Sequence, residues 1–202
     1  ATNEYNILLG TQMIAKGLDF PNITLVGVLS ADTSLHLPDY RSAERTFQLL
    51  TQVSGRAGRH EKQGEVIVQT YTPEHYAIEL SKDQLYEPFY EQEMHNRRLA
   101  GYPPYFYLAL VQVTHEDVMM AAEYSGKVAT YLRENLSFNV SIIGPTTASI
   151  TRLQNRYRYQ CLIKYRIEPN LIPVLLDLIK IYRSEWMKKG ITLSIDLDPT
   201  MM

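Results

Sequence analysis

The sequence has 202 residues, of which 45% are hydrophobic, with a net charge of −2 and a single cysteine, Cys161. This length and composition suffice to bury a core in one or two domains. One cysteine excludes an internal disulfide framework and a cysteine-rich zinc site. No apolar run approaches the ~18 residues of a membrane-spanning helix, so we expect a soluble intracellular protein with no membrane partner.

Three apolar runs dominate the first third of the chain. The runs 5–12, 23–31 and 64–71 are expected to be strands, and the second is long enough to be buried on both faces, as in a parallel sheet. Between the last two, apolar residues recur at helical spacing from Tyr40 to Ala57, with Asp39 as a candidate N-cap. This order of elements predicts part of a parallel α/β sheet.

The end of this predicted helix carries a row of polar residues in the stretch TQVSGRAGR, residues 51–59. At helical spacing, Gln52, Arg56 and Arg59 of this stretch lie within about 60° of one another and of Arg45, which precedes it, opposite the apolar face. Guanidinium groups bind phosphate bidentately, so the row suits phosphate binding. Gly55 and Gly58 each cost roughly 1 kcal/mol inside a helix, but they leave space for an anion or a neighbouring backbone. A solvated charged face at a fraying helix end is the alternative.

The residues between 73 and 104 are expected to form a helical connector. Pro88 is predicted to interrupt it, and the GYPP stretch at 101–104 is predicted to end it. We interpret its tyrosine-rich face as packing surface rather than a base-stacking platform. Arg97 and Arg98 are interpreted as a solvated pair, with contact to DNA phosphate as the alternative.

Residues 105–202, about the last hundred, are predicted to form a separate domain. Apolar patterns predict four strands and two helices in the order βαββαβ: strands near 105–114, 140–146, 156–167 and 191–198, with helices near 118–136 and 169–189. We interpret Gly144-Pro145 as a local interruption of the second strand. The order predicts the split βαβ, ferredoxin-like arrangement, in which two helices cover one face of the sheet.

The predicted strand 156–167 alternates in chemistry. Its odd positions are mostly apolar or aromatic and are assigned to the core, because successive side chains point to opposite faces. Its even face carries cations and a glutamine, with a further arginine nearby: Arg152, Arg156, Arg158, Gln160, Lys164 and Arg166. Charges that only keep a surface soluble are usually mixed in sign. The face is therefore a candidate docking surface for DNA phosphate or an acidic protein tail, and a basic strand without function is the alternative.

Two stretches resemble motifs of the superfamily-two helicases. Residues 52–59 resemble the sixth motif, and residues 11–21, TQMIAKGLDFP, resemble the fifth. Together with NRRLAGYPPY at 96–105 and IDLDP at 195–199, they are similar to the primosomal protein N′ (PriA) family of replication-restart helicases. The resemblance implies the C-terminal part of a RecA-like helicase lobe at 1–72, followed by the connector and the βαββαβ domain.

The resemblance also implies roles for single residues of the sixth motif. Arg59 matches the arginine finger that reaches the γ-phosphate of ATP held by the other helicase lobe. Arg56 matches its companion at the phosphates, and Gln52 matches the residue that orients this network or senses the nucleotide.

The fifth motif is implied to connect nucleotide and DNA. Gly17 and Asp19 match residues that couple the nucleotide to the DNA track, and Thr11 matches a threonine that hydrogen-bonds a nucleic-acid phosphate. The alternatives are that Asp19 caps a turn before Pro21 and that Thr11 ends a strand.

The family implies cofactors and partners for the whole protein. These are ATP and magnesium, held mainly by a missing lobe, and zinc in the parent protein but not in this piece. Implied partners are branched or forked DNA, other primosome proteins and the acidic C-terminal tail of single-stranded-DNA-binding protein, for which Arg156 and Gln160 are candidates. The expected activity is ATP-dependent 3′–5′ DNA unwinding in the nucleoid of the bacterial cytoplasm.

One motif required for ATP hydrolysis is missing from the sequence. There is no G-x-x-x-x-G-K-[ST] phosphate loop, because Gly126-Lys127 is followed by Val128 and lies in a predicted helix. We therefore expect a C-terminal fragment of a longer helicase that does not hydrolyse ATP alone. The alternatives are a docking module without chemistry and another superfamily-two translocase, such as a RecG-like protein.

Overall fold

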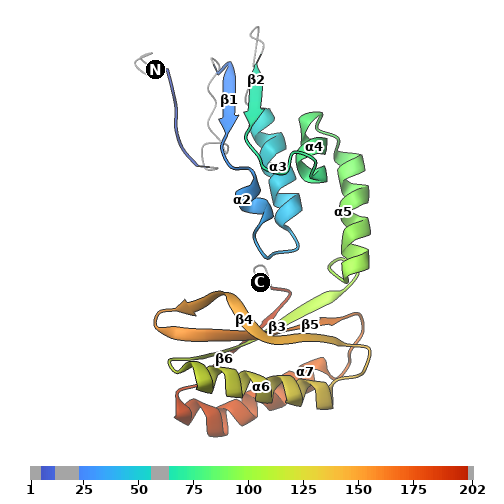
Figure 1. The fold of residues 1–202 in the computed structure, drawn as a ribbon. Coiled ribbons are helices and arrows are strands. Elements are labelled where there is room, and N and C mark those ends of the chain that lie inside the picture. Colours follow the sequence, from blue (N-terminus) through green and yellow to red (C-terminus); the bar gives the residue numbers. More distant parts are fainter. Residues whose placement is uncertain (1–5, 12–22, 56–63, 200–202) are drawn as a thin grey trace. The chain divides into compact units, whose positions relative to one another are not determined.

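The structure is a computed structural model that describes residues 6–11, 23–55 and 64–199 (Figure 1). The chain divides into two compact units, Ala1–His95 and Asn96–Met202. The first unit contains β1 (Leu25–Val28), α2 (Asp32–Leu35), α3 (Ser42–Ser54), β2 (Glu65–Val68) and α4 (Tyr76–Lys82), and α5 (Tyr86–Ala100) passes into the second. The second contains β3 (Tyr107–His115), α6 (Val118–Asn135), β4 (Ser141–Leu153), β5 (Arg156–Tyr165), α7 (Leu171–Ile181), the short helical turns η1 (Tyr182–Trp186) and η2 (Met187–Lys189), and β6 (Thr192–Leu197).

The first unit has a parallel pair of strands, as predicted. β1 and β2 pair in parallel with Val26 opposite Val66, and α2 and α3 connect them. α3 is amphipathic and buries Phe47 and Leu50 on one side. Phe47 stacks on Phe89 of α5 with ring centroids 4.1 Å apart, so the aromatic side chains of α3 and α5 share one small core.

The predicted strand at 5–12 is wrong over its described part, residues 6–11. These residues belong to neither sheet, and Ile7 and Leu9 are 87% and 85% exposed. An apolar run forms a strand only where a neighbouring strand supplies backbone hydrogen bonds and covers its side chains.

The helix predicted to follow Asp39 begins later, at Ser42. The Asp39 carboxylate accepts a hydrogen bond from the backbone N–H of Arg41 at 2.9 Å, and its carbonyl accepts one from Ser42 N–H at 3.0 Å, so a turn precedes the helix. Gly55 follows the last residue of α3 rather than lying within it. The helical penalty expected for Gly55 therefore does not apply, and Gly58 lies outside the described residues.

Pro88 does not interrupt a helix, contrary to prediction. It is the third residue of α5, in the first turn, where a backbone N–H has no partner within the helix. The break lies between α4 and α5, where Gln84 has φ 54°. As predicted, α5 ends before the GYPP stretch, and Gly101 takes φ +66° there.

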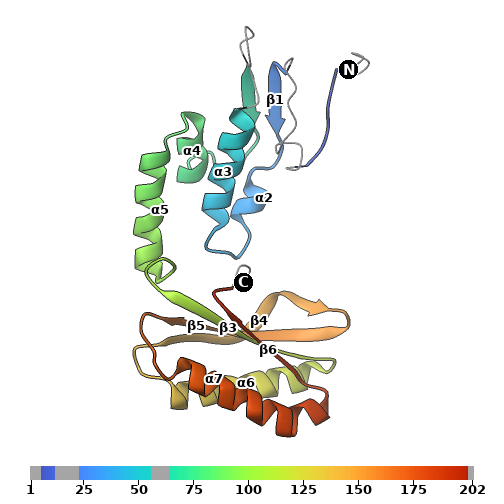
Figure 2. The same cartoon turned by 180° about the vertical axis from the view of Figure 1, so that it is seen from behind.

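The second unit confirms the predicted βαββαβ arrangement. Its four strands are antiparallel in the order β4-β5-β3-β6, which is the strand order of a split βαβ fold. α6 and α7 cover the same face of the sheet (Figures 1 and 2). The core between the layers includes Val111, Cys161 and Ile163 of the sheet, with Val128 and Leu178 of the helices.

β4 is longer and less regular than predicted. It continues through Gly144-Pro145 to Leu153, with register shifts between Ile143 and Thr146 and between Thr147 and Arg152. The hairpin to β5 closes on a two-residue turn, Gln154-Asn155, with φ 49° and 63°. Among the described helices, none is long and apolar enough to cross a membrane.

Candidate nucleotide and nucleic-acid interface

Two of the residues assigned to the helicase motifs lie in the described parts of the chain. Gln52 is exposed on α3, on the side away from buried Phe47 and Leu50, as predicted. Thr11 is exposed at the end of the described segment 6–11. Four further motif residues lie outside the described residues, and their roles stay predictions: Gly17, Asp19, Arg56 and Arg59.

Arg45, predicted on the same face as Gln52, forms an ion pair at the start of α3. Its guanidinium lies 2.8 Å from the Asp39 carboxylate, which also accepts the hydrogen bond from Arg41 N–H. The contact connects the first turn of α3 to the preceding loop. Arg45 therefore contributes to the position of α3 at the end of the helix away from Gln52.

Sequence reasoning missed a buried carboxylate at the carboxyl ends of β1 and β2. Asp32 is only 4% exposed and accepts hydrogen bonds from the hydroxyls of Thr70 and Thr72 at 2.8 and 2.6 Å, and from Tyr71 N–H at 2.9 Å. The Thr72 hydroxyl, followed by the N–H and Thr70 donors, holds the pKa of Asp32 well below its usual range, against the effect of burial.

The sequence contains a pattern from which the hydrogen bonds of Asp32 could have been predicted. An aspartate lies four residues after β1, and a Thr-x-Thr stretch follows β2. The carboxyl ends of neighbouring parallel strands meet at one edge of the sheet, which is also where ligands bind in open α/β sheets. The network therefore fixes the loops at that edge.

Replacing Asp32 with asparagine is expected to make the stability of the first unit less dependent on pH. A carboxyl whose folded pKa is depressed stabilises the fold above its unfolded pKa, about 4, and this contribution is lost as the pH falls towards the folded pKa. We expect Asp32→Asn to lower the melting temperature at about pH 7, with a smaller difference from wild type at about pH 3.

Thermal unfolding followed by circular dichroism at the two pH values checks this expectation. Asp83→Asn, which changes an exposed carboxylate after α4, is the matched control and should have little effect. An equal deficit for Asp32→Asn at both pH values would contradict the proposed role of the charge.

The predicted alternation of β5 is confirmed for its central residues. Cys161 and Ile163 lie in the core, and Tyr165 packs against it. Ile167, assigned to the core side, is exposed because β5 ends at Tyr165 and the chain leaves the sheet.

Lys164 is the most enclosed cation of the even face. It is 7% exposed, donates a hydrogen bond to Ala100 O at 2.9 Å and lies 3.5 Å from the centroid of the Tyr102 ring. Burial lowers the pKa of its ammonium group. The Lys164 ammonium group therefore contacts the end of α5 and the turn that follows it.

Arg156 and Arg158 also have partners within the fold. The Arg156 guanidinium donates to Thr114 O at 3.0 Å and to Gly190 O at 2.6 Å, which ties the end of β3 to the loop before β6. Arg158 Nε donates to Gln112 Oε1 at 3.3 Å, and both arginines are half-buried.

Arg152, Gln160 and Arg166 are the other members of the predicted set, and Arg166 is exposed just after the end of β5. Arg152 is exposed, lies 5.0 Å from the Tyr157 ring centroid and donates to the Asn155 side chain. Gln160 is half-buried opposite Gln112 in the β3–β5 pairing. The structure thus brings four of the six residues onto one strand, β5, and their binding of DNA or an acidic tail stays a prediction.

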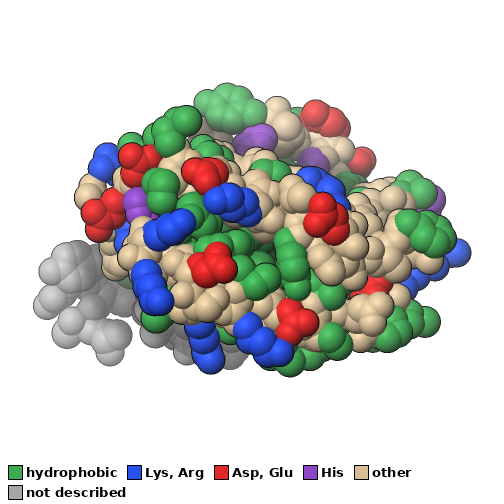
Figure 3. Space-filling view, turned by 90° about the horizontal axis from the view of Figure 1, so that it is seen from below, with side chains coloured by type: hydrophobic (Ala, Val, Ile, Leu, Met, Phe, Trp, Pro, Cys, Tyr) green, Lys and Arg blue, Asp and Glu red, His purple; other side chains and the backbone are tan. Residues whose placement is uncertain are grey.

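The opposite side of the second unit does not share this one-sided charge. Figure 3 shows cations and carboxylates interspersed over the outer face of the helices. Lys127 pairs with Glu123 and Lys180 pairs with Asp177 there. This pattern is typical of a solvated face.

Comparison with known families identifies both parts of the chain. Residues 98–200 match the primosomal protein N C-terminal domain, and residues 1–61 match the helicase conserved C-terminal domain. The chain belongs to the PriA family. The resemblance seen in the sequence motifs is therefore confirmed.

Several PriA proteins are similar over nearly the whole chain. The replication restart protein PriA of Bacillus subtilis is 59% identical over 98% of this chain, which covers 24% of that protein. The PriA proteins of Synechocystis and Chlamydia pneumoniae are 45% and 35% identical over 97% and 98% of the chain, which covers 23% and 26% of them. The chain thus spans about a quarter of the length of the PriA relatives it matches.

Proposed function

We propose that this chain is the C-terminal part of an ATP-driven DNA helicase that assembles the primosome at stalled replication forks. The observation that carries the proposal is the succession, in one chain, of a helicase C-terminal match at 1–61 and a PriA C-terminal match at 98–200. The similar proteins named replication restart protein PriA support the same biological role. The proposed setting is the nucleoid of the bacterial cytoplasm.

In this proposal, the sixth motif completes a nucleotide site whose remaining part belongs to another lobe. Arg59 acts as the arginine finger on the γ-phosphate, Arg56 contacts the phosphates and Gln52 orients the network. ATP and magnesium are held mainly by the other lobe, because this sequence has no phosphate loop. Zinc belongs to the parent protein alone.

The fifth motif supplies the connection to DNA in the same proposal. Gly17 and Asp19 couple the nucleotide to the DNA track, and Thr11 donates a hydrogen bond to a phosphate of the nucleic acid. Repeated cycles of ATP binding and hydrolysis then drive 3′–5′ movement along DNA.

ATP hydrolysis by this chain and by the full-length protein tests the proposal. We expect DNA-stimulated hydrolysis by the full-length protein and none above background by the 202-residue chain, with or without forked DNA. ATP hydrolysis that coelutes with the purified chain would show that it contains a complete nucleotide site and would contradict the proposal.

A second function, docking without chemistry, is favoured by the charge of β4 and β5. Residues 141–167 contain five cations, Arg152, Arg156, Arg158, Lys164 and Arg166, and no aspartate or glutamate. The proposed partners of this surface are forked DNA, the acidic tail of single-stranded-DNA-binding protein and other primosome proteins. Both functions can belong to one protein, since the docking surface and the sixth motif lie in different units.

A further inference from the structure

Three stacked aromatic rings in the first unit end at a buried carboxyl group. Phe47 of α3 stacks on Phe89 of α5, and Phe89 stacks in turn on Tyr76, the first residue of α4, with ring centroids 5.8 Å apart. The Tyr76 hydroxyl donates a hydrogen bond to the Glu93 carboxyl at 2.5 Å. We call Phe47, Phe89 and Tyr76 the ring stack; it and Glu93 belong to the first unit.

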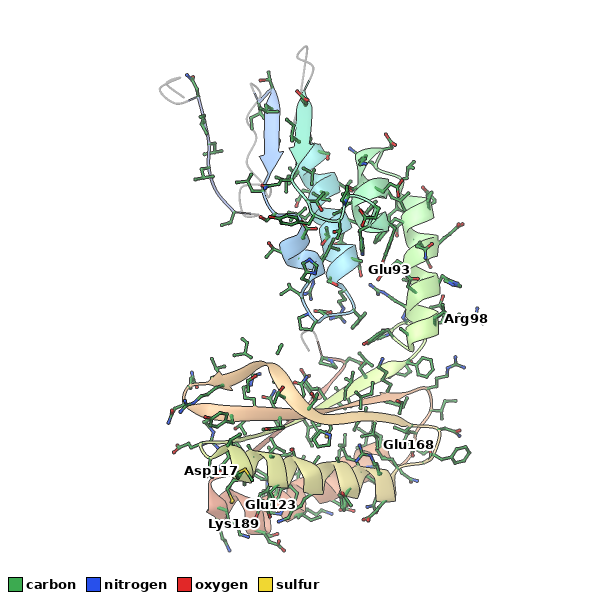
Figure 4. The ribbon with its side chains drawn as sticks, viewed as in Figure 1. Glu93, Arg98, Asp117, Glu123, Glu168 and Lys189 are labelled. Atoms are coloured by element: carbon green, nitrogen blue, oxygen red, sulfur yellow. The ribbon has the colours of Figure 1, made fainter. Side chains whose placement is uncertain are left out.

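Tyr76 is held at two points by the same face of α5. Phe89 and Glu93 are four residues apart in that helix, so they lie one turn apart on one side of it. Figure 4 shows Glu93 on the side of α5 that faces α3 and α4. A stacking contact alone lets a ring slide in its own plane, whereas the hydrogen bond at the hydroxyl also fixes its direction. The two contacts together therefore set the place of the Tyr76 ring against Phe89.

Glu93 is an unusual residue for an aromatic core. Its side chain belongs to a residue that is only 4% exposed, and Phe47 and Phe89 beside it are also buried. A buried carboxyl costs free energy unless it is hydrogen-bonded, whereas apolar side chains tolerate several similar packings. A buried hydrogen bond has a narrow range of favourable geometries and so selects one of these packings. The Glu93–Tyr76 contact therefore specifies how the rings are arranged.

The residue before Tyr76 fixes the start of α4. The His75 ring lies 4.6 Å from that of Tyr76, and its Nδ1 accepts a hydrogen bond from Ala77 N–H at 3.2 Å, which caps the helix. Burial lowers the pKa of His75, and Glu93 acts in the opposite direction, so Glu93 lies close enough to affect that imidazole. Tyr76 is thus held both by the cap of its own helix and by α5.

The other end of the ring stack lies on the helix that leads into the sixth motif. Phe47 precedes Gln52 by five residues, about 7.5 Å along α3, and Arg56 follows the last residue of α3 by two positions. Phe47 packs with α5, while Leu50 packs with Ile78 of α4. Contacts on two sides set the rotation of α3 about its axis, and the direction of Gln52 depends on that rotation.

We propose that Glu93 and Tyr76 are positioning residues for ATP hydrolysis. They fix the ring stack, the ring stack fixes α3, and α3 presents the sixth motif to the nucleotide held by the other lobe. A misplacement of about 1 Å that originates far from the chemistry can lower a rate by as much as about 10²-fold. The inference rests on the proposed function, because it names the supports of the same site.

Steady-state ATP hydrolysis by the full-length protein with saturating forked DNA tests the proposal. We expect Tyr76→Phe and Glu93→Leu each to lower kcat about tenfold, while the KM for ATP stays within about twofold. Glu93→Gln should keep kcat within about twofold of wild type, because the amide oxygen accepts the same hydrogen bond. Tyr90→Phe and Glu91→Gln change exposed residues of α5 and are the matched controls, which should behave like wild type.

Amide hydrogen exchange of the nucleotide-free full-length protein gives a readout that does not depend on catalysis. The amides of α3 should exchange about fivefold faster in Tyr76→Phe than in wild type, because the loss of the hydrogen bond makes local opening easier. Tyr90→Phe should leave their exchange unchanged. Wild-type exchange of α3 in Tyr76→Phe would contradict the link from the ring stack to this helix.

Arg59→Ala separates this inference from the function on which it rests. If Arg59→Ala lowers kcat but Tyr76→Phe and Glu93→Leu do not, the helicase function stands and the positioning role is wrong. Wild-type kcat in Arg59→Ala would instead remove the function itself. A loss of kcat that equals the loss of folded protein, measured by circular dichroism, would make the role of Glu93 structural only, and so would an equal loss in Glu93→Gln and Glu93→Leu.

Discussion

Replacing Arg59 with alanine in the full-length protein is expected to lower kcat for DNA-stimulated ATP hydrolysis by about 10³-fold or more. Arginine fingers supply about 10³ to 10⁵ in phosphoryl transfer because they stabilise charge that develops in the transition state. The KM for ATP should change much less, since little of that charge exists in the ground state. Arg59→Lys should restore only a part of kcat, because lysine keeps the charge but lacks the planar bidentate fork.

Steady-state hydrolysis with saturating forked DNA measures this effect. Arg45→Ala is the matched control, because Arg45 lies on the helix that leads into the motif but pairs with Asp39 at the opposite end. We expect its kcat to stay within a few-fold of wild type. If Arg59→Ala hydrolyses ATP at the wild-type rate, the assignment of the finger to this residue is wrong.

The second large effect is expected at Gly144, in the irregular part of β4. A Cβ there would lie 2.6 Å from Gln160 O and 3.1 Å from Thr146 N, and the backbone has φ +110°, a conformation that favours glycine. We expect Gly144→Ala to destabilise the second unit by roughly 2–4 kcal/mol, from backbone strain together with the displacement of β4 from β5.

Gly126→Ala provides a control of opposite sign. Gly126 lies within α6, and a Cβ added there would meet no atom within 4 Å apart from the helix's own backbone. Alanine should therefore stabilise the helix by about 0.5–1 kcal/mol. Urea unfolding followed by the fluorescence of Trp186, the single tryptophan and a buried residue of the second unit, measures both changes. Equal urea midpoints for Gly144→Ala and wild type would show that β4 can shift without a loss of stability.

The second unit was predictable from sequence because each element finds its partners within the chain. Helical and strand periodicities marked the two helices and four strands, and their order left one common topology. The errors arose where local chemistry or a distant partner overrides periodicity. Asp39 forms a turn before α3, Pro88 fits a first helical turn, and residues 6–11 contain an apolar run but have no place in the described sheets.

The side-chain partners of the candidate site were less accessible to prediction. Alternation along β5 placed the cations on one face, but it says nothing about what they contact. Arg156 reaches Gly190, 34 residues away, and Lys164 reaches Ala100, 64 residues away. Asp32 was missed for the same reason, because its hydroxyl donors lie about 40 residues further along the chain and only strand pairing brings them together.

The burial of Cys161 has a practical consequence for work on this protein. Its thiol lies in the core of the second unit, and burial raises its pKa to about 11, so the thiolate that reacts with maleimides is scarce at neutral pH. Because the chain has no other cysteine, one introduced at an exposed position becomes the preferred attachment point for a dye or spin label. The native sequence thus already serves as a background for site-specific labelling.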